Sequence, residues 1–165
     1  MMISGDTRNG LCVEPMETTP SRRNELGAGL LRILFAPNAV PFDLPNAQAA
    51  DQYAQDLLLA LGQVYQVSRW NTRRFEQLLL RGAVPVWRPG ARVDVVPDGL
   101  RLSMPGCPLQ DEVSRDSKVC EFCQQVQKCA AQRACGRALE ATRFDSLVSQ
   151  GAEACVVRFR LAPGR

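Results

Sequence analysis

Apolar residues recur at helical spacing in a stretch that begins near Asn46 of this 165-residue chain. The stripe that they form comprises Ala50, Ala54, Leu57, Leu58, Leu61, Val64 and Tyr65. A repeat of 3.6 residues is typical of a helix with one buried side. Asn46 is suited to cap the N-terminus of this helix, because its side-chain oxygen can accept a hydrogen bond from a first-turn N–H. Gly62 interrupts the stripe and is expected to allow close packing.

A second helix is predicted from about Thr72, with Asn71 as its N-cap. Its buried side comprises Phe75, Leu78 and Leu79. Gly82 suits the C-terminal cap, where glycine is favoured. The aromatic residues of these two helices and of the segment between them are expected to belong to the core, although they could also line a ligand pocket. They are Tyr53, Tyr65, Trp70 and Phe75.

Residues 91–106 alternate between apolar and polar positions and predict a β-hairpin. The residues at 97–99 (Pro-Asp-Gly) favour a turn, because proline fixes φ and glycine permits a positive φ. A third helix is predicted to begin after Asp116 or Ser117. Its apolar stripe comprises Val119, Phe122, Val126 and Ala130. Residues 144–148 and 154–161 are predicted strands, and Arg158 and Arg160 share the polar face of the second one.

The order of these elements predicts an α+β fold. Helices are expected to pack on a small antiparallel sheet, with a cysteine-rich C-terminal helix and strand. Residues 1–27 mix polar residues and proline without a period, which predicts a disordered N-terminal tail. Residues 28–165 are then expected to form a single α+β ligand-binding domain.

The net charge is only +3, and lysine and arginine do not gather with aromatic residues. We therefore expect no nucleic-acid binding by this chain on its own. Residues 30–36 form the longest apolar run of the early chain, but this run contains Arg32 and is far shorter than a membrane span. No secretory signal precedes it. These features predict a cytoplasmic protein without membrane contact, in which thiols stay reduced.

The chain contains no histidine. This absence removes Ser-His-Asp and Cys-His catalysis, and it removes imidazole as a metal ligand. The sequence also lacks a glycine-rich phosphate loop and a telling pair of carboxylates. A binding or sensing role is therefore favoured over an enzymatic one.

Six of the seven cysteines lie between Cys107 and Cys155. Three explanations are open: metal or cluster ligation, redox chemistry, or packing of small apolar side chains. Cys120 and Cys123 form a C-x-x-C pair, which on a helix places both thiols on one face. Further ligands would come singly from Cys107, Cys129, Cys135 or Cys155. Cys129 borders the opposite side of the apolar stripe, and Cys135 lies about 22 Å along the helix axis from Cys120. Cys12, in the tail, is expected to be incidental.

The C-terminal pattern resembles the 4-vinyl reductase domain family. The resemblance rests on Cys107-Pro108, Cys120, the turn at residues 149–151 and the strand around Cys155. It covers about residues 47–161. It implies an α+β sensor or accessory domain that binds a small hydrophobic or aromatic ligand, forms a homodimer and, in some members, binds zinc through cysteine.

Carried onto this chain, the resemblance gives Cys120, Cys123 and Cys155 as metal candidates, with Cys107 nearby. These four thiols, from a helix, the segment before it and the last strand, are the best metal set. One departure concerns the zinc-binding members, which have a cysteine eight residues before the last one, where this chain has Leu147.

Three functions follow from the sequence. The first is a non-enzymatic small-molecule-binding or sensor domain with a cysteine metal site. The second is a zinc or iron–sulfur protein whose cysteine cluster is the functional centre for redox or gas sensing; an iron–sulfur cluster accepts the same four thiolates. The third is a redox thiol protein that uses Cys120 and Cys123.

Overall fold

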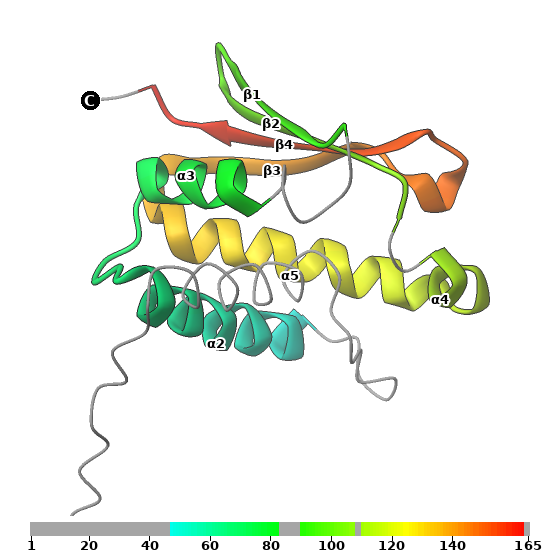
Figure 1. The fold of residues 1–165 in the computed structure, drawn as a ribbon, viewed down its shortest axis with the longest axis horizontal. Helices are drawn as coiled ribbons and strands as arrows, with labels where there is room; N and C mark the ends of the chain where they lie inside the picture. The colour runs from blue at the N-terminus through cyan, green and yellow to red at the C-terminus, as the bar shows by residue number, and fades with distance from the viewer. Residues whose placement is uncertain (1–46, 83–89, 108–109, 164–165) are drawn as a thin grey trace, which may run out of the picture.

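The computed structural model describes residues 47–82, 90–107 and 110–163. The helices are α2 (Ala47–Tyr65), α3 (Thr72–Gly82), α4 (Gln110–Arg115) and α5 (Ser117–Cys135), with short 3₁₀ turns η2 (Gly136–Ala138) and η3 (Val148–Gln150). The strands are β1 (Arg92–Val96), β2 (Gly99–Pro105), β3 (Leu139–Ser146) and β4 (Ala154–Leu161). Figure 1 shows the sheet above α3 and α5, with α2 on the far side of α5. The predicted α+β class, with cysteines in the C-terminal helix and strand, is confirmed.

The caps of the helices follow from local chemistry. Asn71 Oδ1 accepts a hydrogen bond of 2.9 Å from the N–H of Arg74, and Asp116 Oδ1 accepts one of 2.9 Å from the N–H of Lys118. These bonds satisfy first-turn donors that have no partner within the helix. Gly62 is buried in α2, and a Cβ there would lie 3.2 Å from the carbonyl oxygen of Val67. The expected close packing at Gly62 is therefore present.

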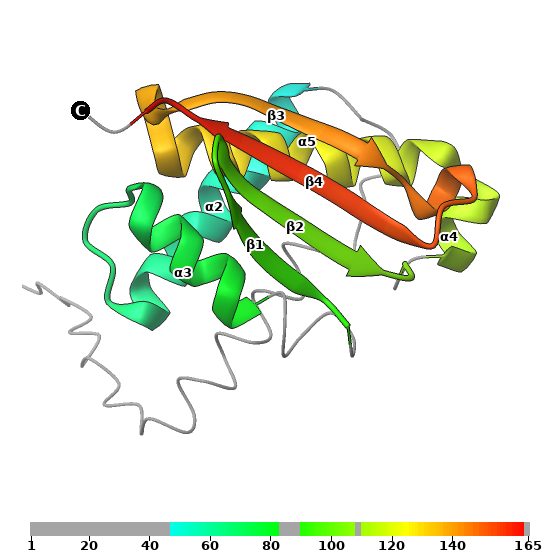
Figure 2. The same ribbon diagram turned by 90° about the horizontal axis from the view of Figure 1, so that it is seen from above.

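The four strands form one antiparallel sheet in the order β1-β2-β4-β3 (Figure 2). The predicted hairpin is the β1–β2 pair, and β4 lies between β2 and β3. At the hairpin turn, Gly99 has φ +144°, and a Cβ there would lie 2.0 Å from the carbonyl oxygen of Phe159. Only glycine fits at this position, because the backbones of β2 and β4 approach each other too closely here for a side chain.

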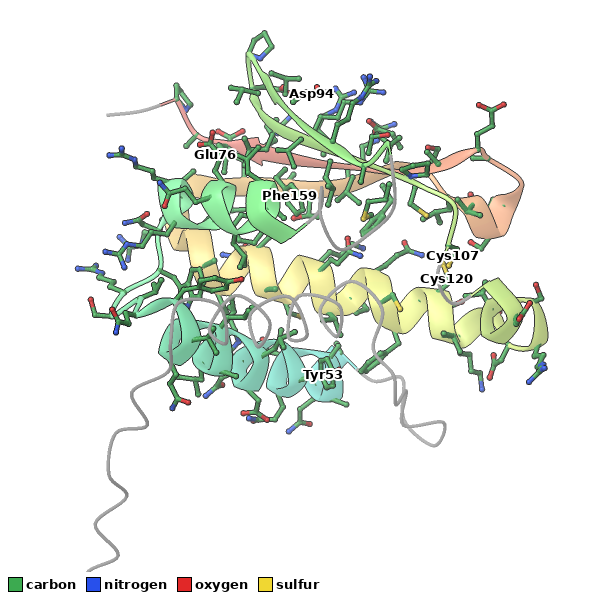
Figure 3. The ribbon with its side chains drawn as sticks, in the orientation of Figure 1. Tyr53, Glu76, Asp94, Cys107, Cys120 and Phe159 are labelled. Carbon is green, nitrogen blue, oxygen red and sulfur yellow. The ribbon has the colours of Figure 1, made fainter. Side chains whose placement is uncertain are left out.

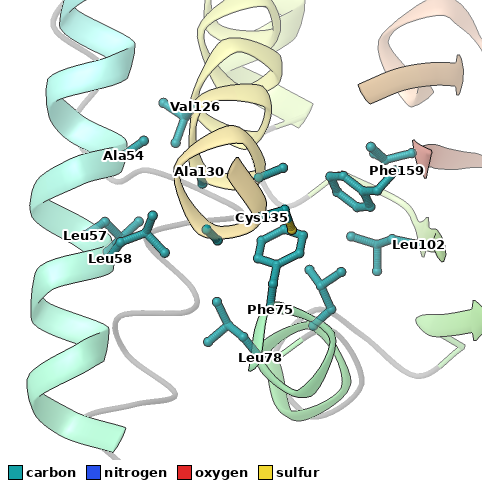
Figure 4. Packing of buried hydrophobic residues seen from close by; sticks show 14 of the residues in the cluster. Ala54, Leu57, Leu58, Phe75, Leu78, Leu102, Val126, Ala130, Cys135 and Phe159 are labelled. Carbon is teal, nitrogen blue, oxygen red and sulfur yellow. The ribbon is translucent and has the colours of Figure 1, made fainter. Parts of the chain in front are cut away.

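The core lies between the inner face of the sheet and the two long helices (Figure 4). Phe75 of α3 meets Phe159 of β4 edge to face, with ring centroids 5.3 Å apart. Tyr53 of α2 meets Phe122 of α5 in the same manner at 5.8 Å. The predicted buried stripes are correct except at Val64 and Tyr65, which are half-buried at the end of α2.

Two local predictions need correction. The strand predicted at residues 144–148 is β3, which begins five residues earlier at Leu139 and ends at Ser146. Residues 148–150 form the turn η3 instead. The short helix α4 was not expected. The predicted tail, the Asn46 cap and Cys12 lie outside the described residues. Among the helices that the structure describes, none has both the length and the apolarity that crossing a membrane requires.

Candidate functional site

Four cysteines from three parts of the fold line one cavity. Cys107 follows β2, Cys120 and Cys123 lie on α5, and Cys155 is the second residue of β4. The cavity has a volume of about 40 Å³. Figure 3 labels Cys107 and Cys120, which lie together between the end of β2 and α5. The structure therefore brings together the four thiols that were predicted as a metal set.

The backbone explains why these cysteines meet. Cys155 pairs with Met104 in the β2–β4 ladder, three residues before Cys107. The N–H of Gly106 donates to the carbonyl oxygen of Glu153 at 3.3 Å, which holds the segment after β2 against the start of β4. The remaining wall of the cavity is largely apolar. It includes Met104, Val113, Phe144 and Leu147.

Polar hydrogens already point at two of the four sulfur atoms. The N–H of Val148 donates to Cys155 Sγ at 3.3 Å. The amide of Gln124 donates to Cys120 Sγ at 3.5 Å, and Ser149 Oγ lies 3.2 Å from the same sulfur. Hydrogen bonds to sulfur support negative charge on a cysteine that ligates a metal.

The cavity disfavours thiolates while no cation balances them. Burial is the main cause that raises the pKa of Cys123 to about 12, and the neighbouring thiols Cys120, Cys107 and Cys155 contribute to the same rise. Burial also raises the pKa of Cys155, against the Val148 hydrogen bond, which lowers it. Without a cation Cys123 and Cys155 are protonated at neutral pH, and binding a metal would release protons from them.

Gln127 of α5 is a polar residue in the same wall. Its side chain is only 6% exposed, and Oε1 is buried without a hydrogen-bond partner in the described structure. A buried acceptor that lacks a donor is destabilising by about 1–3 kcal/mol. Sequence reasoning missed Gln127, because a glutamine within a helix usually faces solvent.

The other two described cysteines stay outside the cavity. Cys135 is buried at the opposite end of α5. Burial raises its pKa to about 11, although a hydrogen bond with Thr72 acts in the opposite direction. Cys129 packs against the core, where burial raises its pKa and Asp51 raises it further. Their separation from Cys120 agrees with the geometry expected of a straight helix.

The four thiols share a cavity but do not yet converge on one point. Among the described residues, no three Cys, Asp or Glu side chains are close enough together in this conformation to hold a metal ion. Cys120 Sγ and Cys155 Sγ instead lie near Ser149 and Val148. Rotation about χ1 moves each sulfur among three staggered positions, so a metal would require these side chains to leave the positions that they occupy here.

A second and larger cavity, of about 270 Å³, lies where α2 turns into α3. It is lined by Tyr65, Gln66, Val67, Trp70, Arg74, Gln77 and Leu78. The N–H of Val67 donates to Gly62 O at 2.8 Å and Trp70 Nε1 donates to Leu58 O at 3.2 Å, so the connector is fixed to α2.

The aromatic residues that were considered for a ligand pocket divide between two environments. Tyr65 and Trp70 line the second cavity, whereas Tyr53 and Phe75 pack in the core. The larger cavity therefore lies at the connection between α2 and α3, and only two of these four aromatic residues line it. Arg74 of α3 also lines this cavity.

Comparisons with protein-family models, with curated proteins and with solved structures find no match to this chain.

Proposed function

We propose that this chain is a zinc-binding domain whose metal lies in the cysteine cavity. Cys120, Cys123 and Cys155 are the thiolate ligands, and Cys107 beside them is the fourth candidate. The observation that carries the proposal is that four thiols, from α5, β4 and the segment after β2, line one small cavity. Zinc accepts thiolate ligands, and this chain offers no imidazole.

The size of the cavity favours a single ion. Pockets for drug-sized molecules enclose about 300–1,000 Å³, and this cavity encloses about 40 Å³. An iron–sulfur cluster, which contains several iron and sulfide atoms, needs more room than one zinc ion. The raised pKa of Cys123 also disfavours a redox thiol, because the thiolate is the reactive form.

Bound zinc would supply a crosslink between α5 and the last strand. Because the ion binds the folded chain and not the unfolded one, it would stabilise the domain by mass action. Leu147, where zinc-binding members of the resembling family have a cysteine, lies in the wall of the same cavity. Cys123 would take the place of that missing ligand.

The experiment compares metal content in two variants with the wild-type chain. Protein purified under reducing conditions without added metal or chelator is analysed by mass spectrometry for zinc and iron, and by its visible spectrum. We expect about one zinc per chain and no colour. Cys123→Ser should lose the zinc and melt at a lower temperature, whereas Cys129→Ser, on the same helix outside the cavity, should retain it. A metal-free wild-type protein, or equal zinc in both variants, would contradict the proposal.

The second cavity supports small-molecule binding as a second function. Its volume of about 270 Å³ approaches that of ligand pockets, and Tyr65 and Trp70 offer aromatic surfaces. Arg74 has no carboxylate partner within the described parts of the chain. These features suit an aromatic ligand that carries an acidic group, consistent with a non-enzymatic sensor in the cytoplasm.

Benzoate serves as the probe for this second function. It should raise the melting temperature of the wild-type chain and of Arg73→Gln, whose side chain is exposed on the same helix. The rise should be absent in Arg74→Gln. If benzoate and larger aromatic carboxylates leave the melting temperature of the wild type unchanged, the cavity is not a site for this class of ligand.

A further inference from the structure

Gln127 lines the cysteine cavity, and its Oε1 is a buried hydrogen-bond acceptor without a donor among the described residues. The side chain is buried within a wall of thiols and apolar groups, and the described residues supply no partner for this oxygen. Buried polar groups in folded proteins are almost always hydrogen-bonded, to protein or to an ordered small molecule. This oxygen therefore indicates a donor that belongs to a ligand in the cavity.

The donor cannot be a metal ion or a thiolate. A bare zinc ion has no hydrogen to donate, and cysteine loses its hydrogen when it binds a metal. The cavity has room for a further small group. One water needs a cavity volume of about 10–15 Å³, and this cavity has a volume of about 40 Å³. A ligand much larger than water does not fit beside the ion.

We propose that the zinc site is open: three thiolates hold the ion, and its fourth position takes a water-sized ligand that donates a hydrogen bond to Gln127 Oε1. The inference rests on the proposed zinc site. Water fills this position in the resting protein, and other water-sized donors such as hydrogen sulfide belong to the same class. Zinc sites with three protein ligands and a water are the reactive kind, whereas four thiolates close the site.

The geometry assigns the three thiolates. Cys120 and Cys123 lie three residues apart on α5, so both thiols share one face of that helix. Cys155 lies on β4, which is held in the sheet by its pairing with β2. Cys107 lies outside these two elements, in the segment after β2, and is then the cysteine that lies beside the ion without binding it.

X-ray absorption at the zinc edge of the full-length wild-type protein is the direct test. An open site gives three sulfur neighbours at about 2.3 Å and one oxygen at about 2.0–2.2 Å. Four sulfur neighbours would overturn the inference while leaving the proposed zinc function intact. A protein without zinc would overturn both, so the two failures are distinguishable.

Zinc affinity, measured by competition with a chromophoric chelator, provides the second test. Gln127→Leu should weaken zinc binding by about 10- to 100-fold, the range typical for groups that support metal ligands. Gln125→Leu, on the exposed side of the same helix, should bind zinc as the wild type does. If Gln127→Leu binds zinc with the affinity of the wild type, the buried oxygen makes no hydrogen bond to a zinc ligand and the inference fails.

Cys107→Ser tests the assignment of the ligands. An open site predicts that this variant keeps one zinc per chain and the wild-type absorption spectrum at the zinc edge. Loss of zinc from Cys107→Ser would show that Cys107 fills the fourth position, and the site would be closed.

Discussion

Arg133 of α5 binds both carboxylate oxygens of Asp51 in α2, with Nε 2.7 Å from Oδ1 and Nη2 2.5 Å from Oδ2. The two residues are 82 positions apart in the chain. A two-point contact between a planar guanidinium and a carboxylate fixes orientation as well as distance. This ion pair therefore links α2 to α5 at their exposed sides, beside the apolar contacts between the two helices.

The first prediction concerns the pH dependence of this ion pair. The Arg133 guanidinium, mainly through its hydrogen bond, lowers the pKa of Asp51 below 3.8. The pair therefore stabilises the fold above the unfolded-state pKa of about 4, and this contribution is lost as pH falls through the lowered pKa of the folded state. Asp51→Asn should melt below the wild type at pH 7 and approach it at pH 2–3, as followed by circular dichroism. A pH-independent difference would contradict this account.

The second prediction concerns Cys135 and the stability of the fold at alkaline pH. Burial raises its pKa from 9.0 to about 11 in the folded state. The folded chain thus keeps the thiol proton to higher pH than the unfolded chain does. The stability that this provides is complete below pH 9 and is lost as pH rises through 11. Urea unfolding from pH 8 to 11 should show a shallower alkaline fall for Cys135→Ala than for the wild type. Parallel curves would mean that Cys135 does not titrate in the folded protein.

Gly99→Ala is the third prediction. The backbone here has φ +144°, and a Cβ would meet the carbonyl oxygen of Phe159 at 2.0 Å. Because such strain costs about 1–3 kcal/mol before any clash, the variant should lose at least about 2 kcal/mol of unfolding free energy in urea. Gly151→Ala is the matched control: φ is +87°, but nothing lies within 4 Å of its Cβ. A smaller loss at Gly99 than at Gly151 would refute the argument.

The outer face of the sheet gives the fourth prediction. The register places Arg101, Arg158 and Arg143 directly across from one another on β2, β4 and β3. Asp145 pairs with Arg158 and Arg143, but Arg101 has no carboxylate partner in the described residues, and its Nε is buried without an acceptor. Like charges directly opposite each other across strands are destabilising.

Arg101→Thr should therefore raise the unfolding free energy by about 0.2–1 kcal/mol at low salt. The gain should shrink in high salt, where the repulsion in the wild type is screened. Arg92→Thr is the comparison, because Arg92 pairs with Asp94 on β1. An equal gain in both variants would point to threonine propensity and not to the row of arginines.

Sequence periodicity predicted the long helices, the hairpin and β4 because each buries one regular face. It placed the start of β3 five residues too late for a physical reason. The register shifts between Leu139 and Ala141 and between Phe144 and Ser146, so the strand has no unbroken alternation. Between Leu139 and Phe144, only Thr142 faces inward, opposite Phe159.

The candidate site was predictable in its residue types but not in its surroundings. Spacing along one helix separated Cys120 and Cys123 from Cys129 and Cys135. The approach of Cys107 to Cys155 depends on β2 pairing with β4, which is a contact between distant parts of the chain. The orphan oxygen of Gln127 and the cavity at the α2–α3 turn arise from three-dimensional packing, for which the sequence carries no local signal.

The strand order β1-β2-β4-β3 has a consequence for how the protein is made. β4 joins the two halves of the sheet, yet among the four described strands it is the last to leave the ribosome. Until residues 154–161 emerge, β2 and β3 each expose an edge without its neighbour, and such edges pair readily with other chains. A nascent or truncated chain that ends before β4 is therefore the form most exposed to aggregation through these edges, and the pairing of β4 removes the hazard.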